Sequence, residues 1–464
     1  MITERMSRRD FVKVSAALAV GTGASVLSEA KAATRTLYYA SPTGHGDGRS
    51  EASPFRITDF WTVAQPGDTL LLLDGKYAGA KAMINPPKGL KGRQGKPIAI
   101  KALNDGRVLI DGEGRHRPVR LYHNDYFIIE GINACRSSDT VVESSRSNYN
   151  IARRICAWDA ADGNTNIFAA HYGEHNLFED CAGWGIARKT YSNSQGGNYT
   201  TYRRCWGRWE GSHVVGPKMT YSCFYNSHHI VLESCIGTWD ARKMRESYVL
   251  LDYDGKPFVK KGSKRYGVAL TLKNYEVDQP YGIFSADNYY PNIEMPRNGP
   301  YLYGCIAYVL PAPKLRSFSG VFQIGWGRGR DDGRIENCLA YVHPAVTTVG
   351  STFSLFRFRG RNLTAVGGSI QFKASQIESV RQSDTGHDIV AERGHLLDTP
   401  GGASMVYRYE NGKLTDKPLW PWPMNQRIID AMRLAGYDAL VDVTKTIFEL
   451  AGGKMPDFEE RSER

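Results

Sequence analysis

The sequence lacks several features that would assign the chain to a common class. Its eight cysteines include no Cys-x-x-Cys pair, which argues against a structural zinc site. After residue 32, no apolar run approaches the ~20 residues that a membrane-spanning helix needs. Helical periodicity is confined to short stretches, around residue 60 and after residue 424. These absences favour one large globular unit whose core is built from strands.

Acidic residues are fewer than basic ones. The chain has 48 Asp and Glu against 59 Lys and Arg, a formal net charge of +11. The first 32 residues hold five basic and three acidic side chains, so the rest of the chain keeps +9. A basic protein is biased towards polyanions, namely acidic polysaccharide, nucleic acid or a membrane surface. A solvated basic surface without a partner gives the same count, so charge alone does not choose.

The N-terminus resembles a twin-arginine export signal. Its SRRDFVK sequence at residues 7–13 is followed by a weakly apolar stretch at 14–27, and Ala30-Lys31-Ala32 supplies small residues for cleavage. A short membrane anchor is the alternative, but Gly21 to Gly23 interrupt the apolar run. We therefore expect residues 1–32 to be removed. The mature protein would be periplasmic or secreted, without membrane insertion.

A repeated phrase between Asp125 and Trp239 organises the rest of the chain. Its copies read DYFIIEGINAC, SNYNIARRICAW, EHNLFEDCAGW, NYTTYRRCWGRW and HHIVLESCIGTW. The closing cysteines are spaced by 21, 25, 24 and 30 residues, which indicates stacked units. Each unit is too short for a helix pair and suits one coil of a parallel β-helix. Equivalent residues of neighbouring coils should then form columns about 4.8 Å apart.

The cysteines follow the same rhythm. Seven of the eight close a strand-like run, as in YLYGC and GRIENC. We expect them to form a ladder of small buried residues inside the stack. A set of disulfides, which an oxidising compartment would permit, is the alternative.

The N-terminal coils carry a family resemblance. The phrases LYYASPTG, SPF, PGDT and DGKY, followed by GKPIAIKALNDGRVLIDGEG at residues 95–114, resemble the start of right-handed parallel β-helix proteins. That group includes polysaccharide lyases of the alginate and chondroitin type, and the pattern covers residues 36–240. The resemblance implies an all-β, single-stranded right-handed parallel β-helix. It specifies activity less well, because the fold also hosts hydrolases, esterases, epimerases and adhesins.

We expect three parts in the chain. After the signal at 1–32, the β-helix occupies 33–375 with a long excursion at about 240–300, and a loop and helical extension fills 376–464. A short helix near Phe60 should cap the N-terminal end of the stack. Helical patterns at Asn425–Ala435 and Ala439–Leu450 should pack on an end or flank and hide an open strand edge. We expect a monomer.

Two motifs fit common functions poorly. His171-Tyr-Gly-Glu-His175 matches the H-x-x-E-H zinc-protease motif, which needs both histidines on one helical face. On a strand, two residues four apart lie ~13 Å from each other, too far for one metal. The glycine-rich run at residues 325–330 lacks the strand–turn–helix context of a nucleotide loop.

Counting from the repeat cysteines predicts a functional stripe. Eight residues on lie Asn164, Lys189, His213 and Lys243. Seven residues on lie Gly163, Arg188, Ser212 and Arg242, and three to five on lie Asp159, Glu210 and Asp240. If the register holds, one outer wall of the stack carries a basic file with acidic neighbours. A solvated charged face is the alternative.

Such a stripe suits β-elimination of a uronic-acid polymer. A base removes the C5 proton, a cation neutralises the adjacent carboxylate, and an acid protonates the leaving oxygen. In the resembled lyases, a lysine base is followed about one coil later by an arginine, and calcium held by Asn and Glu neutralises the carboxylate. The family's closely spaced acidic pair before the lysine is missing here. A metal-free mechanism using Arg188 or Arg242 therefore stays open beside a calcium-dependent one.

The resemblance and the stripe together assign roles. Lys189 fits the base and Arg208 the acid. The full catalytic set is Lys189, Arg208, His213 and Lys243; the substrate-binding set is Asn164, Arg188, Arg242, Trp184 and Trp209; a calcium site would use Asp159, Glu210 and Asp240. The tryptophans that follow the cysteines can either stack on sugars or form a ladder within the fold. Tyr172, Tyr191 and Tyr199 can either line the groove or pack.

The sequence thus predicts an exported lyase acting on an acidic polysaccharide, with no nucleic-acid partner. A non-catalytic glycan-binding or envelope protein on the same scaffold is one alternative. A glycoside hydrolase is another, and it would need a carboxylate pair ~5–9.5 Å apart, supplied by Asp159, Glu210 or Asp240.

Overall fold

The computed structural model describes most of the chain up to residue 239 and shorter segments after it. The described residues are 36–161, 164–210, 218–239, 250–251, 268–269, 280–286, 300–309, 322–324, 333–336, 338–342, 358–361, 364–366, 389–390 and 407–437. The predicted signal, most of the excursion at 240–300 and the helical pattern at Ala439–Leu450 lie outside them.

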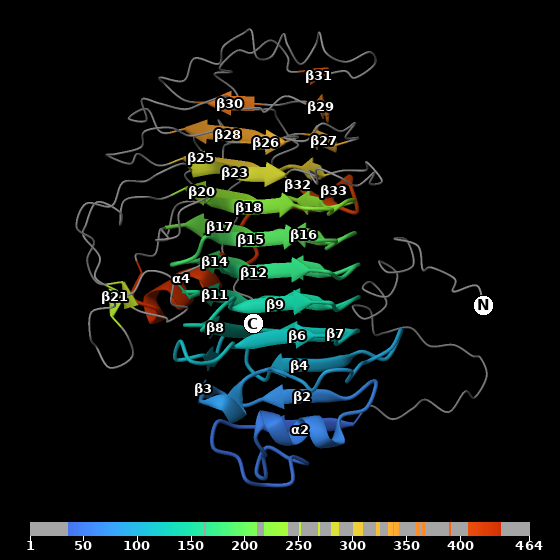
Figure 1. The fold of residues 1–464 in the computed structure, drawn as a ribbon, viewed down its shortest axis with the longest axis vertical. Coiled ribbons are helices and arrows are strands. Elements are labelled where there is room, and N and C mark those ends of the chain that lie inside the picture. The colour runs from blue at the N-terminus through green and yellow to red at the C-terminus, as the bar shows by residue number, and fades with distance from the viewer. Residues whose placement is uncertain are drawn as a thin grey trace, which may run out of the picture.

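Three parallel sheets wind around one core (Figure 1). In the described part of the chain, sheet A contains, in order, β1 (Leu37–Ala40), β2 (Thr69–Leu72), β4 (Ile98–Ala102), β7 (Phe127–Glu130), β10 (Ile151–Arg153), β13 (Leu177–Glu179), β16 (Thr201–Arg203), β19 (Val231–Glu233), β24 (Tyr301–Tyr303), β27 (Gly333–Glu336), β29 (Phe358–Arg361) and β31 (Ile389–Val390). Each of these strands begins a coil.

The second and third sheets complete the coils. Sheet B contains β3 (Gly75–Ala78), β5 (Val108–Asp111), β8 (Ile132–Cys135), β11 (Cys156–Trp158), β14 (Ala182–Trp184), β17 (Trp206–Trp209), β20 (Ile236–Trp239), β25 (Ile306–Val309), β28 (Leu339–Val342) and β30 (Thr364–Val366). Sheet C contains β6 (Val119–Tyr122), β9 (Val142–Ser145), β12 (Asn166–His171), β15 (Lys189–Ser194), β18 (Lys218–Phe224), β23 (Pro280–Ala286) and β26 (Phe322–Ile324). The chain passes from A to B to C and pairs in parallel with the coil below, so the predicted parallel β-helix is confirmed.

Columns of identical positions fill the interior. Phe168, Tyr191 and Tyr221 stack ring on ring in sheet C, with centroids 4.9 and 4.6 Å apart. These distances are close to the ~4.8 Å strand spacing, as expected for rings in register. A cysteine ladder precedes sheet B, made of Cys181, Cys205, Cys235, Cys305 and Cys338.

All eight cysteines are buried and none forms a disulfide. The predicted ladder of small buried residues is therefore confirmed for these five members. Two earlier cysteines lie outside it. Cys156 pairs with Ala182, one residue out of line with Cys181, and Cys135 pairs with Trp158. The cysteine count is thus an imperfect guide to register.

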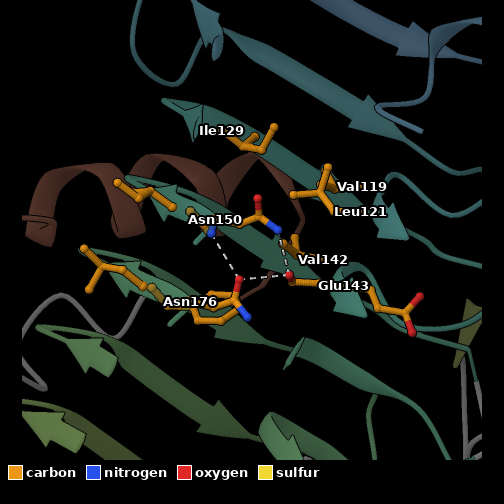
Figure 2. A pocket seen from close by; sticks show the side chains of 12 residues that line it. Val119, Leu121, Ile129, Val142, Glu143, Asn150 and Asn176 are labelled. Carbon is orange, nitrogen blue, oxygen red and sulfur yellow. Dashed lines mark hydrogen bonds between the residues drawn. The ribbon is translucent and has the colours of Figure 1, made fainter. Parts of the chain in front are cut away.

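Asparagines stabilise the turn from sheet C to sheet A. Asn150 donates from Nδ2 to the carbonyl of Asn124 at 2.9 Å, and the Asn150 amide donates to Oδ1 of Asn176 at 3.2 Å. Figure 2 shows Asn150 and Asn176 beside a small internal hollow that apolar side chains such as Val119, Leu121 and Ile129 also line. This hollow is part of the interior packing, so a polymeric substrate would have to bind on the outer surface of the coils.

Separate elements cover the lower end and one flank. Helix α2 (Ile57–Val63) buries Ile57 and Phe60 at the foot of the stack, and the 3₁₀ turn η1 (Ala80–Ala82) lies near it. Helix α4 (Asn425–Leu434) lies on sheet B beside β11 (Figure 1). Its Ile428 and Met432 pack with Trp184 on the outer side of sheet B. Both predicted positions, a cap and a flank, are confirmed for these two helices.

Two short antiparallel pairs complete the described elements. β21 (Leu250–Leu251) pairs with β22 (Val268–Ala269), and β32 (Tyr407–Glu410) pairs with β33 (Lys413–Pro418). The second hairpin docks on sheet A, where the Gly412 amide donates to Oε1 of Glu233 at 2.6 Å. No helix among the described residues is long and apolar enough to span a bilayer.

Candidate functional site on the outer face of sheet C

Alternation along sheet C separates its inner and outer faces. Tyr191 lies in the core, so its neighbour Ser192 faces outward. Ser192 pairs with Ala169 of the preceding coil, and Ala169 pairs with Glu143 of the coil before that. The Glu143 carboxylate binds the Arg117 guanidinium at 2.8 Å. The outer face therefore carries short side chains over the middle coils, with charged residues at its lower end.

Lys189 lies at the start of β15, on this outer side. A Cβ added to Gly183 would meet the methyl group of Thr190 and the ring of Phe168, so Thr190 fills the interior. Because Thr190 and Tyr191 both face inward, the strand bends between them, and Lys189 projects to the side of Ser192. The Lys189 side chain is 6% exposed.

Burial makes Lys189 an unusual lysine. Desolvation disfavours its charged form, and the nearby guanidinium of Arg188 adds repulsion, so its pKa falls to about 7. About half of such amines are neutral at pH 7 and can accept a proton. The described residues thus provide a base whose pKa matches the pH of ordinary catalysis.

His171 and Ser194 lie at the far end of the same face. They occupy paired positions at the ends of β12 and β15, and Ser194 Oγ lies 2.7 Å from Nδ1 of His171. Burial lowers the pKa of His171 to about 4, and the charge of Lys189 acts in the same direction. The imidazole is therefore neutral near pH 7 and can donate or accept one hydrogen bond. Lys189 and Ser194 are the first and last residues of β15, so Lys189 and the His171–Ser194 pair lie at opposite ends of one strand.

Arg188 and Asn164 form the polar rim next to Lys189. The Arg188 guanidinium donates to Oδ1 of Asn164, and burial lowers the pKa of Arg188, with Tyr225 acting against this. Arg188 is half-buried and Asn164 is exposed. A cation at such a rim suits a substrate carboxylate.

The predicted vertical file needs correction. Strand pairing places Asn166, not Asn164, beside Lys189, because the turn before β12 is longer than the turn before β15. Asn164 and Arg188 nevertheless meet through their side chains. His213, Lys243, Arg242 and Asp240 lie outside the described residues, so their roles stay predictions.

Arg208 cannot be the predicted acid in this arrangement. It lies on β17 in sheet B, is 1% exposed, and donates to Oε1 of Glu210 in a buried ion pair. The other oxygen of Glu210 accepts the amide of Gly185 at 2.7 Å. This pair fixes the corner between sheets B and C, and the prediction of a catalytic Arg208 is wrong.

Two of the three proposed calcium ligands, Asp159 and Glu210, have their oxygens engaged in other contacts, whereas Asp240 lies outside the described residues. Oδ1 of Asp159 accepts hydrogen bonds from the Ile186 amide and the Tyr437 hydroxyl, at 3.0 and 2.5 Å. A Cβ at Gly185 would lie 2.3 Å from the same oxygen, so the space beside it is filled. In the part of the chain that the structure describes, no cluster of His, Cys, Asp and Glu could hold a metal ion. Asp159 and Glu210 therefore act as turn-stabilising carboxylates.

The tryptophans pack instead of lining a groove. Trp184 stacks on Trp158 at 5.3 Å under α4, and Trp209 stacks on Trp239 at 3.9 Å in the core. Trp184 and Trp209 are fully buried, so the prediction that they bind sugar is wrong. Among the tyrosines, Tyr191 is interior, whereas Tyr172 is 46% exposed.

Sequence reasoning did not propose His171 and Ser194 as candidate site residues. His171 was considered only within the zinc-protease motif. A usable signal was present: in VVESS, NIFAAH and KTYSNS the third strand of the coil ends in a polar residue, namely Ser145, His171 and Ser194. Aligning these strands, in place of the cysteines, would have brought His171 and Ser194 together.

Comparisons with known proteins give one short sequence match and several distant structural likenesses. No family model matches the chain. Over 85 residues the chain is 34% identical to pectate lyase L of Dickeya chrysanthemi. The matched stretch covers 17% of this chain and 20% of that protein. Among solved structures, the pectate lyase Pel9A is 12% identical with a TM-score of 0.49, over 74% of this chain and 78% of that one. The alginate lyase from Paenibacillus sp. str. FPU-7 is 11% identical with a TM-score of 0.43, over 66% and 92%.

The three parallel sheets show the parallel β-helix architecture directly. The chain spans about a fifth of the curated relative that it matches. The activity of these proteins does not transfer to this chain at such identities.

Proposed function

We propose that this chain is an exported polysaccharide lyase that cleaves a uronic-acid-containing polysaccharide by β-elimination. One observation carries the proposal. Lys189, on the outer face of sheet C, has a pKa of about 7 and lies next to Arg188. A neutral amine beside a fixed cation is what proton abstraction next to a carboxylate requires. The short match to pectate lyase L and the basic net charge of the chain agree with an acidic glycan.

The reaction follows from these residues. Arg188, held by Asn164, pairs with the substrate carboxylate and acidifies the neighbouring C5–H bond. The Lys189 amine takes the C5 proton, the C–H electrons form the C4–C5 double bond, and the bond from C4 to the glycosidic oxygen breaks. The Lys189 ammonium then returns its proton to the departing oxygen. His171, neutral and placed by Ser194, donates or accepts one hydrogen bond with a sugar hydroxyl.

Export belongs to the same proposal. The SRRDFVK sequence and the small-residue site at 30–32 support translocation through the twin-arginine route, after which the mature chain would meet its substrate in the periplasm or outside the cell. We propose that it acts there as a monomer.

The test is a screen for unsaturated sugar ends, which absorb in the ultraviolet. Purified protein is incubated with polygalacturonate, alginate, glycosaminoglycans and glucuronan at several pH values. We expect absorbance to rise on at least one of them. Lys189→Ala should lower the rate ~10²–10⁴-fold, the usual contribution of a general base. Lys81→Ala is the matched control, because Lys81 is an exposed lysine in η1, away from sheet C.

The screen also separates the alternatives. New reducing ends without ultraviolet absorbance would indicate a hydrolase and contradict the lyase. Retention on an acidic glycan column, without products and without any effect of Lys189→Ala, would indicate a binding protein.

A further inference from the structure

One turn position after sheet C is occupied in the same unusual way in five successive coils. The residues there have positive φ angles of 59°, 52°, 53°, 55° and 51°, and they are His123, Arg146, Tyr172, Gln195 and Tyr225. This left-handed region favours Gly and Asn over residues with large side chains. The chain nevertheless places a long polar or aromatic side chain there in every coil. We call this column the turn track.

The turn track is an exposed surface with aromatic faces. Tyr172 and Tyr225 are 46% and 43% exposed, among the most exposed large hydrophobic side chains that the structure describes. The guanidinium of Arg146 lies 4.4 Å above the Tyr172 ring, so a cation and an aromatic face are presented together. Sugars bind to such surfaces through their C–H faces and their charged groups.

The track is basic at both ends. At its lower end, His123 lies near Lys88, Lys91 and Arg146, whose charges lower its pKa together with desolvation. At its upper end, Tyr225 lies within electrostatic range of Arg188. The nearby carboxylate of Asp125 is held by Lys91 at 2.6 Å. The potential along the track therefore favours an anionic ligand.

The track continues from the His171–Ser194 end of sheet C. Tyr172 follows His171 directly, and Gln195 follows Ser194, so each strand that ends in the site continues into the track. The Arg146 amide donates to the His171 carbonyl at 2.8 Å, which ties the neighbouring coils together. Five coils span about 19 Å at the usual strand spacing.

We propose that the turn track binds one chain of a carboxylated polysaccharide along the β-helix axis, with about one sugar per coil. The inference rests on the proposed function for its substrate class and extends it to a preference for long chains over dimers. Arg146 and Lys88 pair with the carboxylates, and Tyr172 and Tyr225 support sugar rings two coils apart.

The experiment measures binding in the absence of cleavage. The full chain carrying Lys189→Ala is assayed by affinity electrophoresis in polygalacturonate, alginate and neutral dextran. Arg146→Asn and Tyr172→Asn are compared with it, since Asn tolerates the left-handed backbone and should preserve folding. Arg107→Asn is the matched control, because Arg107 is an exposed arginine in the turn before sheet B. Circular dichroism melting confirms that each variant is folded.

We expect Tyr172→Asn to weaken binding of one acidic polymer roughly three- to tenfold. Arg146→Asn should weaken it about two- to fivefold, more at low salt than at high salt. Arg107→Asn should bind the acidic polymer as tightly as the parent Lys189→Ala chain. Neither chain should bind dextran. Hexamers should bind more tightly than dimers of the same sugar.

The proposed binding role of the turn track would be overturned if both track variants keep their affinity, or if dimers bind as tightly as hexamers. Either result would count even if the wild-type chain cleaves its substrate. Binding that is lost in the track variants of a chain that cleaves nothing would support the track and reject the lyase. Equal binding of dextran would overturn the carboxylated-chain assignment.

Discussion

At the residue scale, burial gives Lys189 and Arg208 opposite roles. Both are buried cations of neighbouring coils. Arg208 is held in a buried ion pair with Glu210, so it is structural. Burial and Arg188 lower the pKa of Lys189 to about 7, and a lysine can release its proton. The residue that can act as a base is therefore the lysine.

The pH dependence of kcat/KM is the first prediction. Lys189 must be neutral to take a proton, so the rate should rise as pH increases through about 7 and level off above it. The rising limb is measured by ultraviolet absorbance between pH 5 and 9. A rate that is flat from pH 5 to 9, or that falls as pH rises through 7, would contradict the role of Lys189.

Arg188 should affect substrate recognition and rate together. Arg188→Ala removes the cation at the rim and should lower kcat/KM by roughly 10²-fold on a carboxylated polymer. Arg188→Lys keeps the positive charge but cannot form two parallel hydrogen bonds to a carboxylate, so its kcat/KM should fall less than that of Arg188→Ala. On a methyl-esterified polymer the Arg188→Ala variant should differ little from the wild type. Equal losses on both polymers would show that Arg188 acts on folding and not on the carboxylate.

At the element scale, sheet A carries an alternating charge ladder on its outer face. Lys101, Glu130, Arg153, Glu179 and Arg203 follow one another in register, and Arg203 continues to Glu233 at 2.9 Å. Each coil therefore pairs with a charge opposite to its own, which penalises a shifted register. Burial alone would raise the pKa of Glu179, but three arginines bring it down to about 2.

Acid stability follows from this ladder. Because the pKa of Glu179 is lower in the folded than in the unfolded chain, its stabilisation is present above pH ~4.5 and is lost as pH falls towards 2. The contribution is on the order of 2–3 kcal/mol. Glu179→Gln should lower the free energy of unfolding at pH 6 and flatten its decline in acid, measured by denaturant titration.

Glu51→Gln, at an exposed carboxylate, is the control for this experiment. If both variants show the same decline in acid, the ladder does not contribute to acid stability.

Elements also explain where sequence reasoning succeeded. The sequence predicted the strands and the residues that close them because the pattern of one coil repeats. It predicted the helix at Asn425–Ala435 from the spacing of its apolar residues. The register was not, because turns before sheet C differ in length between coils: eight residues separate Trp158 from Asn166, and five separate Trp184 from Lys189. The count from the cysteines therefore places Asn164, in place of Asn166, beside Lys189. Lys189 begins β15 and Arg188 directly precedes it, and their catalytic roles remain proposals.

At the scale of the whole molecule, the fold buries several side chains that the sequence alone suggested were exposed binding residues. No sequence signal distinguishes Trp209 inside the coil from a sugar-binding ring on its surface, since this depends on which way the strand faces. The same applies to Asp159, whose carboxylate is bound by Tyr437, 278 residues away. Contacts at that range arise only once α4 has folded back onto sheet B.

The cysteines test this burial across the whole stack. All eight are buried without disulfides, and burial raises the pKa of Cys205 and Cys235 well above that of a free thiol. Under native conditions we expect a thiol reagent to label fewer than one cysteine per chain, and after denaturation all eight. Labelling is followed by mass spectrometry without reductant. Fewer than eight reactive thiols in the denatured chain would reveal disulfides and contradict the ladder.

The ionisation of Lys189 tests the central claim most directly. In the full chain labelled with ¹³C at the lysine Cε, the signal absent from Lys189→Met can be followed from pH 5 to 11. We predict a midpoint near 7 for this lysine, well below the range of an ordinary exposed lysine side chain. A midpoint above 10 for Lys189 would leave it charged at neutral pH and remove the base from the proposed site.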